Sequence, residues 1–301
     1  MEKQVLVTGG TGFIGQELCP VLISRGYLPT VFSRQSASEV QAVCGRVNVI
    51  NDLDSLEAHA GFEAVINLAG EGIADKRWSE SRKQALMDSR IGLTHKLASL
   101  ISSWQQPPSV VVSGSAVGYY GDQSDKQVTE GTPPNDEFTH QMCRDWEAEA
   151  VALQSEHTRV CLSRTGLVVG PGGGFLQRML LPFKLGLGGR IASGNHYMPW
   201  VHRDDVVSAL IWMVETSDAN GAYNVVSPHP VTNRDFTQTL GKVLGRPTLF
   251  PVPAAVLKVA LGEMARLLLT GQNAHPKRLQ DQGFEFSYKD LESALKDATR
   301  F

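Results

Sequence analysis

The sequence has no long hydrophobic run and almost no excess of charge, and each absence excludes a class of protein. No apolar run reaches the ~18 residues that a transmembrane helix needs. The most apolar stretch, residues 254–269, is interrupted by Lys258, Glu263 and Arg266. The 28 Lys and Arg residues are balanced by 31 Asp and Glu residues, so there is no basic excess to attract nucleic acid. We therefore expect neither a membrane nor a nucleic-acid partner.

Cysteine is also scarce, at four residues in a chain of 301. Cys19, Cys44, Cys143 and Cys161 form no C-x-x-C pair, and the eight histidines show no metal-ligand spacing. A strand-like run at residues 4–8 leaves no room for a signal peptide. The sequence therefore predicts reduced, mostly buried thiols in a cytoplasmic protein without a metal site.

The first half of the chain alternates short apolar runs with helical spacing. Strands are predicted at residues 5–7, 30–32, 47–50, 64–68, 110–112 and 159–163, and helices at 16–25, 79–104 and 139–154. Short continuous apolar strands separated by helices are typical of a parallel sheet covered on both faces. The predicted fold class is therefore α/β, with a Rossmann-type doubly wound parallel sheet.

A glycine-rich segment, residues 8–15, follows the first predicted strand and opens the first predicted helix. Glycines there let the backbone turn tightly and approach a pyrophosphate, while the helix N-terminus offers free N–H groups. A tight turn without a ligand is the alternative, but strand, glycines and helix in phase favour dinucleotide binding. The residues expected to contact the dinucleotide here are Gly9, Thr11, Gly12, Phe13, Ile14 and Gly15.

The end of the second predicted strand indicates which dinucleotide binds. A site for NAD places a carboxylate ~20 residues after the glycines, where it binds the ribose 2′-hydroxyl. Here the chain reads Phe32-Ser33-Arg34 and has no acid. Arg34 can pair with a 2′-phosphate and stack on adenine, and Ser33 can donate to the same phosphate. A solvated surface arginine is the alternative; we predict NADP (NADPH) as the cofactor.

Four segments carry a resemblance to a known family: residues 9–15, 67–70 (Asn-Leu-Ala-Gly), 113–115 (Ser-Gly-Ser) and 200–205 (Trp-Val-His-Arg-Asp-Asp). Together they resemble the extended short-chain dehydrogenase/reductase superfamily, in the branch that contains nucleotide-sugar epimerases. The tail, residues 271–284, is similar to the extra C-terminal domain of an atypical bacterial epimerase-like family whose substrate is unassigned.

The resemblance implies further cofactor contacts. Asp52 and Leu53 would flank the adenine, and Leu68, Ala69 and Gly70 would pass the ribose and pyrophosphate. Arg90 stands where the superfamily usually has an asparagine, so its cation would reach the phosphates; a surface ion pair is the alternative. The loop with Gly166 and Val168 would border the nicotinamide.

The resemblance also implies catalysis by a serine and by a tyrosine followed four residues later by a lysine. Ser115 matches the serine, after the fifth predicted strand. None of the six tyrosines has a lysine four residues later, and the helix that should carry the pair reads Phe-Thr-His-Gln-Met-Cys at residues 138–143. Ordinary superfamily catalysis is therefore not predicted.

Several side chains can replace the missing pair. Tyr119 and Tyr120 follow Ser115 on the loop that leaves the sheet, and either can donate a proton or simply pack. His140 can be an acid or base, or a solvent-facing histidine. Glu71 can be a base, or a carboxylate at a helix start. For Cys143 as a nucleophile, nothing in the sequence marks a lowered pKa.

The region before residue 201 bears on the substrate. Nucleotide-sugar enzymes usually carry an arginine there, and the equivalent position is Met198, which argues against a nucleotide-diphosphate substrate. The neighbouring Asn195, His196, Tyr197 and Trp200 predict an aromatic, mostly uncharged pocket, or anchors between two domains.

The second half is less regular, with helices predicted at 204–215 and 234–244, a strand at 222–226 and a mostly helical tail. We expect an NADP-binding domain at 1–170, with 200–226 packing back onto it, and a smaller helical cap from 171–199 and 227–301. The predicted function is an oxidoreductase or epimerase acting on a small carbonyl or hydroxyl compound. A non-catalytic NADPH-binding regulator or redox sensor is the alternative, as is a vestigial site. The long helices predicted at 79–104 and 139–154 are also compatible with pairing across a homodimer.

Overall fold

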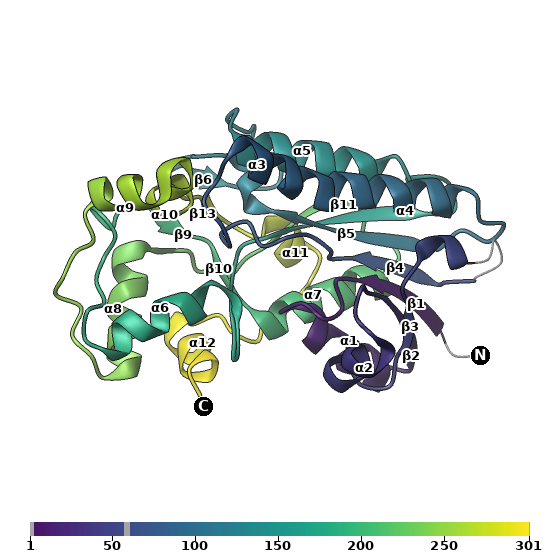
Figure 1. The fold of residues 1–301 in the computed structure, drawn as a ribbon, viewed down its shortest axis with the longest axis horizontal. Helices are drawn as coiled ribbons and strands as arrows, with labels where there is room; N and C mark the ends of the chain where they lie inside the picture. Colours follow the sequence, from purple (N-terminus) through teal and green to yellow (C-terminus); the bar gives the residue numbers. More distant parts are fainter. Residues whose placement is uncertain (1–2, 57–60, 301) are drawn as a thin grey trace.

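A computed structural model describes residues 3–56 and 61–300 of the protein (Figure 1). Seven parallel strands form the central sheet in the order β11-β7-β5-β4-β1-β2-β3. They are β1 Lys3–Thr8, β2 Tyr27–Phe32, β3 Asn48–Ile50, β4 Ala64–Asn67, β5 Val110–Ala116, β7 Arg159–Thr165 and β11 Gly221–Val225. The strand order reverses between β1 and β4, so the sheet is doubly wound and the predicted fold class is confirmed.

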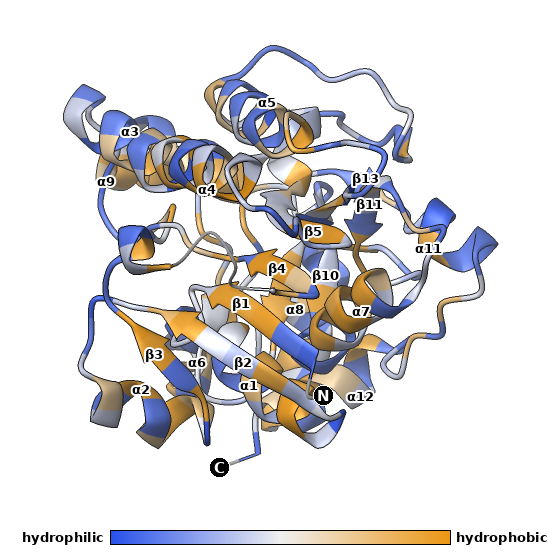
Figure 2. Cartoon of the chain, turned by 90° about the vertical axis from the view of Figure 1, so that its right-hand side faces the viewer, coloured by the Kyte–Doolittle hydropathy of each residue, from blue (hydrophilic) through white to orange (hydrophobic). Residues whose placement is uncertain are grey.

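Helices cover both faces of the sheet, whose strands are largely hydrophobic (Figure 2). Val5 and Val7 of β1 pack against α1 (Gly15–Ser24), α2 (Ala37–Cys44) and α7 (Arg203–Glu215). Leu6, between them in β1, faces α4 (Leu93–Ser102) and α5 (Phe138–Val151). The alternation along a single strand thus divides the core into two layers.

Two predicted boundaries on the site side of the sheet were wrong. The strand predicted at 110–112 continues through Ala116, so Ser115 lies within β5 rather than after it, opposite Arg164 of β7. Gly114 permits this, because a Cβ there would lie 2.9 Å from the ring of Trp146. The segment 166–168, predicted as a loop, contributes to β8 (Leu167–Val169), which pairs with β10 (Trp200–His202).

The long helix predicted at 79–104 is interrupted by a π-helical turn. α3 (Glu80–Met87) leads into the five-residue turn Asp88–Gly92, which continues as α4. Thr94 explains part of this distortion. Its hydroxyl donates to the Arg90 carbonyl (2.7 Å) and accepts from Asn67 (2.8 Å) and Trp146 (3.0 Å). Such turns are frequent at functional sites, and this one carries Arg90.

The rest of the chain forms a mostly helical region beside the sheet, on the left of Figure 1. Its helices are α6 Gly174–Lys184, α8 Asn233–Leu244, α9 Ala254–Leu261, α10 Arg266–Leu269 and α12 Leu291–Ala298. By contrast, α11 (Lys277–Asp281) packs through Leu279 onto the core of the sheet, beside β11 (Figure 1). Two short strand pairs hold this part of the chain. One joins β9 (Tyr197–Met198) to β12 (Val231–Thr232), and the other joins β13 (Asn273–Ala274) to β6 (Gln127–Val128), in the segment between β5 and α5. Within the described residues, no helix has the length and apolarity to span a bilayer.

His202 joins the sheet-covering helix α7 to the C-terminal helix α12. Its fully buried ring stacks on Tyr288 at 3.8 Å and lies 3.2 Å from a carboxylate oxygen of Asp297. Burial lowers the pKa of His202, although the carboxylates of Asp204, Asp297 and Asp205 act in the opposite direction. The folded protein therefore keeps this ring neutral to lower pH than the unfolded chain does.

We expect a specific acid sensitivity from this arrangement. Above pH 6.5, the ordinary pKa of histidine, both states are neutral and the stability contributed by the neutral ring is complete. Below it the unfolded chain binds a proton that the folded state resists, so stability falls by up to about 1.4 kcal/mol per pH unit. Urea unfolding at pH 7.5, 6.5 and 5.5 measures this slope. It should be shallower in His202→Gln and unchanged in His157→Gln, an exposed control; equal slopes in all three proteins would contradict it.

Candidate functional site

The turn after β1 is packed against the turn after β4. Gly9 has a φ of +70°, and a Cβ there would lie 2.8 Å from the backbone carbonyl carbon of Leu68. The Thr8 hydroxyl donates to Asn67 (2.6 Å) and accepts from the Ala69 amide (3.2 Å). Gly12 is exposed at the apex of the turn. The two strand ends are thus held side by side at the switch point of the sheet, where dinucleotides bind in this fold.

The aromatic side chain of this turn anchors a second glycine-rich loop. Cβ atoms at Gly173 and Gly174 would lie 2.6 and 2.8 Å from the ring of Phe13. Arg203 stacks over the same ring at 5.1 Å and pairs with Glu17 of α1 at 2.8 Å. Phe13 therefore fixes the loop 170–174 over the N-terminus of α1.

Arg34 lies at the end of β2 with an exposed side chain. Among the described residues it has no hydrogen-bond or ion-pair partner. The backbone on either side of it is held by Asn51, whose amide donates to the carbonyls of Ser33 (2.7 Å) and Gln35 (2.8 Å). The position is therefore fixed while its guanidinium is free to bind an anion.

The residues expected along the adenine and phosphates differ in accessibility. Asp52 is exposed, whereas Leu53 is buried in the core. Arg90 donates to the carbonyls of Glu71 (2.7 Å) and Leu86 (3.1 Å), and a Cβ at Gly70 would lie 3.0 Å from its guanidinium. Arg90 thus holds the turn after β4 in place and presents its cation beside Gly70.

The segment expected at the nicotinamide is tightly packed. A Cβ at Gly166 would lie 2.0 Å from the Pro199 carbonyl oxygen, and the Gly166 amide donates to Val225 at 3.0 Å. Val168 is half-buried in β8 against the sheet core. Its strand pairing with β10 joins the two halves of the chain at this point.

Ser115 belongs to a buried polar network that was not predicted. Its hydroxyl donates to Glu147 of α5 at 2.6 Å. Arg164 of β7 donates to both oxygens of the same carboxylate, each at 2.8 Å, and to the Tyr120 hydroxyl at 3.0 Å. Tyr120 in turn donates to Asn224 at 2.7 Å. All five side chains are buried, so the network is a pre-organised part of the core beneath the end of β5.

The carboxylate of Glu147 stabilises the charged form of Arg164 in this network. Burial by itself lowers the pKa of Arg164, but the hydrogen bonds and charge of Glu147 outweigh that effect and hold the pKa above its ordinary value. Burial raises the pKa of Tyr120 to about 12, and Arg164 opposes that shift only in part. Tyr120 is therefore a neutral, inaccessible hydrogen-bonding residue, and of the two tyrosines the geometry favours Tyr119 for contact with a substrate.

Tyr119 lies on the 3₁₀ turn after β5, half-buried. The guanidinium of Arg164 lies 3.5 Å from the centre of its ring, which is cation–π contact. Within the described chain, the phenolic oxygen of Tyr119 has no hydrogen-bond partner, so it remains available. Tyr119 is thus held by its ring and free at its hydroxyl.

The other nominated residues have structural partners. His140 is buried rather than solvent-facing, and its Nδ1 lies 2.7 Å from the Tyr119 carbonyl oxygen, which requires a proton on Nδ1. Glu71 is paired with Arg82. Burial raises the pKa of Cys143 to about 12, so it is a neutral thiol and not an activated nucleophile.

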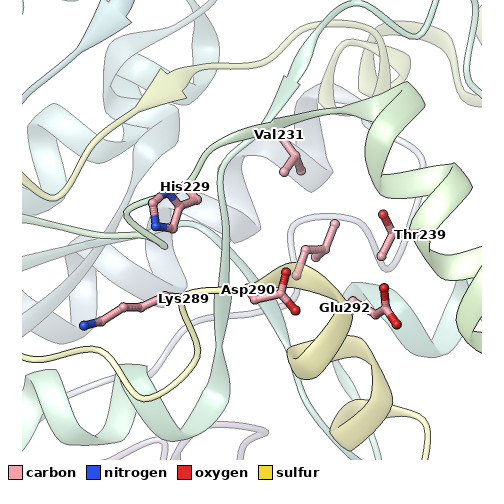
Figure 3. Close-up of a pocket in the computed structure, with 7 residues that line it drawn as sticks. His229, Val231, Thr239, Lys289, Asp290 and Glu292 are labelled. Atoms are coloured by element: carbon pink, nitrogen blue, oxygen red, sulfur yellow. The ribbon is translucent and has the colours of Figure 1, made fainter.

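Trp200 and Met198 are buried in the helical region, so they anchor it rather than line an open pocket. The indole of Trp200 donates to the His229 carbonyl at 3.2 Å. A pocket of about 530 Å³ lies on the outer side of this region, between α8, α12 and the loop before β12 (Figure 3). Its Glu292 is already bonded to Lys242 at 2.6 Å. None of the predicted cofactor or catalytic residues lines this pocket.

The sequence reasoning missed Glu147 and Arg164. Both are charged residues at buried positions, on the inward face of α5 and near the end of β7. A charge at a position that the element's spacing turns inward is the signal that could have identified them. Trp78, which precedes α3, packs edge-on against Phe138 at 5.0 Å and lines a second pocket of about 420 Å³.

Comparison with known proteins adds independent findings. Residues 5–226 match the model of the NAD dependent epimerase/dehydratase family, and residues 252–298 match a domain of unknown function, DUF1731. The mouse epimerase family protein SDR39U1 is 38% identical over 98% of this chain and 99% of its own. Epimerase family protein YfhF of Bacillus subtilis is 36% identical over 97% and 96%. A crystal structure of human SDR39U1 with NADPH superimposes with a TM-score of 0.90 at 37% identity, covering 99% of this chain and 100% of that one.

Proposed function

Because this chain belongs to the NAD-dependent epimerase/dehydratase family, we propose that it binds NADPH in the turn after β1 and acts on a small carbonyl or hydroxyl compound. The observation that carries the cofactor proposal is the free Arg34 at the end of β2, on backbone fixed by Asn51, beside an exposed glycine turn. The human relative of the same fold was crystallised with NADPH, which supports the same choice.

We propose that Ser115 contacts the reacting oxygen of the substrate and that Tyr119 transfers the proton. The bound cofactor would supply the redox chemistry: NADPH would give a hydride to a carbonyl, and NADP⁺ would take one from a hydroxyl-bearing carbon. Arg164 supports both residues, through Glu147 for Ser115 and through its ring contact for Tyr119. The cofactor contacts proposed beyond the glycine turn are Ser33, Arg34, Asp52, Leu53, Leu68, Ala69, Gly70, Arg90, Gly166 and Val168.

The alternative is a non-catalytic NADPH-binding regulator. It is favoured by the absence of any tyrosine with a lysine four residues later. Steady consumption of NADPH with a library of carbonyl compounds would exclude it. For the organisation of the chain, we propose a cofactor domain of residues 1–170 with 200–226 and a cap of 171–199 with 227–301, in a cytoplasmic protein whose long helices pair in a homodimer.

A thermal-shift titration tests the cofactor proposal. NADPH and NADP⁺ should raise the melting temperature, because a ligand that binds only the folded state stabilises it by mass action. NADH and NAD⁺ should give a much smaller shift at equal concentration, since they lack the 2′-phosphate. Arg34→Ala should lose the preference for the phosphorylated cofactors, by about 1.5–3 kcal/mol of binding free energy.

Arg25→Ala is the matched control, because Arg25 is also an exposed arginine near the end of an element, but it is paired with Glu215. Its melting temperature should rise with NADPH as the wild type's does. Equal shifts with all four cofactors in the wild type would overturn the assignment of NADPH, and no shift with any of them would overturn cofactor binding itself.

A further inference from the structure

The hydrogen-bond network beneath β5 fixes the direction in which the Ser115 hydroxyl points. Arg164 can only donate hydrogen bonds, and it donates to both oxygens of Glu147. Both Glu147 oxygens accept from the guanidinium in a bidentate ion pair, and a carboxylate in such a pair can only accept. The hydrogen between Ser115 Oγ and Glu147 Oε1, across 2.6 Å, therefore belongs to Ser115.

The rest of the network is consistent with this assignment. The Tyr120 hydroxyl accepts from Arg164 and donates to Asn224 Oδ1, whose amide nitrogen then donates to the His275 carbonyl at 3.0 Å. Each hydroxyl proton in this chain of bonds thus has an acceptor, Glu147 for Ser115 and Asn224 for Tyr120. The neighbouring Cys143 offers no competing charge to Ser115, because burial raises the pKa of its thiol to about 12.

A hydroxyl has one hydrogen and two lone pairs. Since its hydrogen is given to Glu147, Ser115 can offer only a lone pair to anything bound at the end of β5. Ser115 is 6% exposed, and a ligand bound at the end of β5 would meet it through this remaining surface. A carbonyl oxygen brought to Ser115 would place two acceptors against each other, whereas a hydroxyl would complete the bond.

We infer that Ser115 is a hydrogen-bond acceptor and that the site selects ligands that present a hydroxyl group, not a carbonyl, to this position. Glu147 and Arg164 are positioning residues that set this polarity. The inference rests on the proposed function in placing the substrate at Ser115. Within that function, it assigns the substrate class as a secondary alcohol and leaves any bound carbonyl oxygen to the free hydroxyl of Tyr119.

Neutron diffraction from deuterated crystals of the full-length protein tests the polarity directly and needs no ligand. The expected result is a deuterium atom on Ser115 Oγ directed at Glu147, with both Glu147 oxygens free of deuterium. A deuterium atom on Glu147, or one on Ser115 directed away from Glu147, would overturn the inference. This result is independent of the NADPH titration, so failure of the proposed cofactor site is recognised separately.

A binding experiment tests the ligand class. Secondary alcohols and the ketones of the same carbon skeletons are compared by ligand-observed NMR, with the protein saturated with 2′-phospho-ADP-ribose, which has no nicotinamide and so prevents turnover. Each alcohol that binds should bind about tenfold more tightly than its ketone. Tighter binding of the ketones, equal binding, or no binding by any alcohol would overturn the assignment of the class.

Two serines of β5 provide the matched variants. Ser115→Ala removes the acceptor and should abolish the preference by weakening alcohol binding about tenfold while leaving ketone binding unchanged. Ser113→Ala removes a buried hydroxyl of the same strand, which donates to the Gly114 carbonyl at 3.3 Å, and should keep the preference. Loss of the preference in both variants would show a structural effect and overturn the role of Ser115.

Discussion

Replacing Glu147 by alanine is expected to lower the free energy of unfolding by about 3–5 kcal/mol, because it leaves the buried cation of Arg164 without its partner. The substitution removes two hydrogen bonds from Arg164 and the acceptor of the Ser115 hydrogen. Arg164 is buried and recovers little of this loss from solvent. The measurement is urea unfolding of the cofactor-free protein.

Glu149, two residues further along α5, provides the control. It pairs with His95 at 2.9 Å on the surface, where the histidine side chain is 70% exposed. Exposed ion pairs contribute about 1 kcal/mol or less, so Glu149→Ala should unfold close to the wild type. Equal losses in the two variants would show that α5 tolerates no alanine there, and the stabilising role of the buried pair would be rejected.

Gly15→Ala and Gly12→Ala are expected to change different properties, the stability of the free protein in the first case and cofactor binding in the second. A Cβ at Gly15 would lie 2.3 Å from the Gly9 carbonyl oxygen and 2.6 Å from the Gly10 Cα, and backbone atoms cannot move aside. Gly15→Ala should therefore cost about 3 kcal/mol of stability even without cofactor. At Gly12 the nearest atom is 3.2 Å away and the residue is exposed. Gly12→Ala should change the stability of the free protein by about 0.5 kcal/mol or less.

The cofactor should reverse the ranking of the two variants. A pyrophosphate approaches the backbone where glycine leaves room for it, so Gly12→Ala should lose the rise in melting temperature that NADPH gives the wild type. Gly15→Ala, where it still folds, should keep part of that rise. Melting curves of both variants with and without NADPH make the comparison. A Gly12→Ala protein that NADPH stabilises as strongly as the wild type would remove Gly12 from the site.

The doubly wound parallel class of the central sheet could be predicted because its strands are short, mostly apolar and separated by helices. Local pattern was less informative where tertiary contacts decide an element's length. β5 runs past Val112 into Ser113, Gly114 and Ser115, which have little strand propensity, because pairing with β7 and packing against Trp146 hold them there. The π-helical turn at Asp88–Gly92 has no sequence signal, since it depends on the contacts of Thr94.

The candidate site also has one part that the sequence indicates and another part that only the folded structure shows. The glycine turn and Arg34 are contiguous motifs, so the sequence indicates them directly. The network of Ser115, Glu147 and Arg164 draws its members from β5, α5 and β7. These three residues meet only in the folded chain, so their spacing along the sequence does not show that they are in contact. For the same reason the sequence could not separate Tyr119 from Tyr120, whose burial depends on Asn224 far along the chain.

The last strand of the sheet has a consequence for the synthesis of the protein. β7 ends at Thr165, but its outer neighbour β11 begins only at Gly221. A ribosome adding ~5–20 residues per second leaves that edge of the nascent sheet without a partner for several seconds. An unpaired strand is a template for pairing with other chains, so this interval during translation is when the chain is most open to aggregation and most dependent on chaperones.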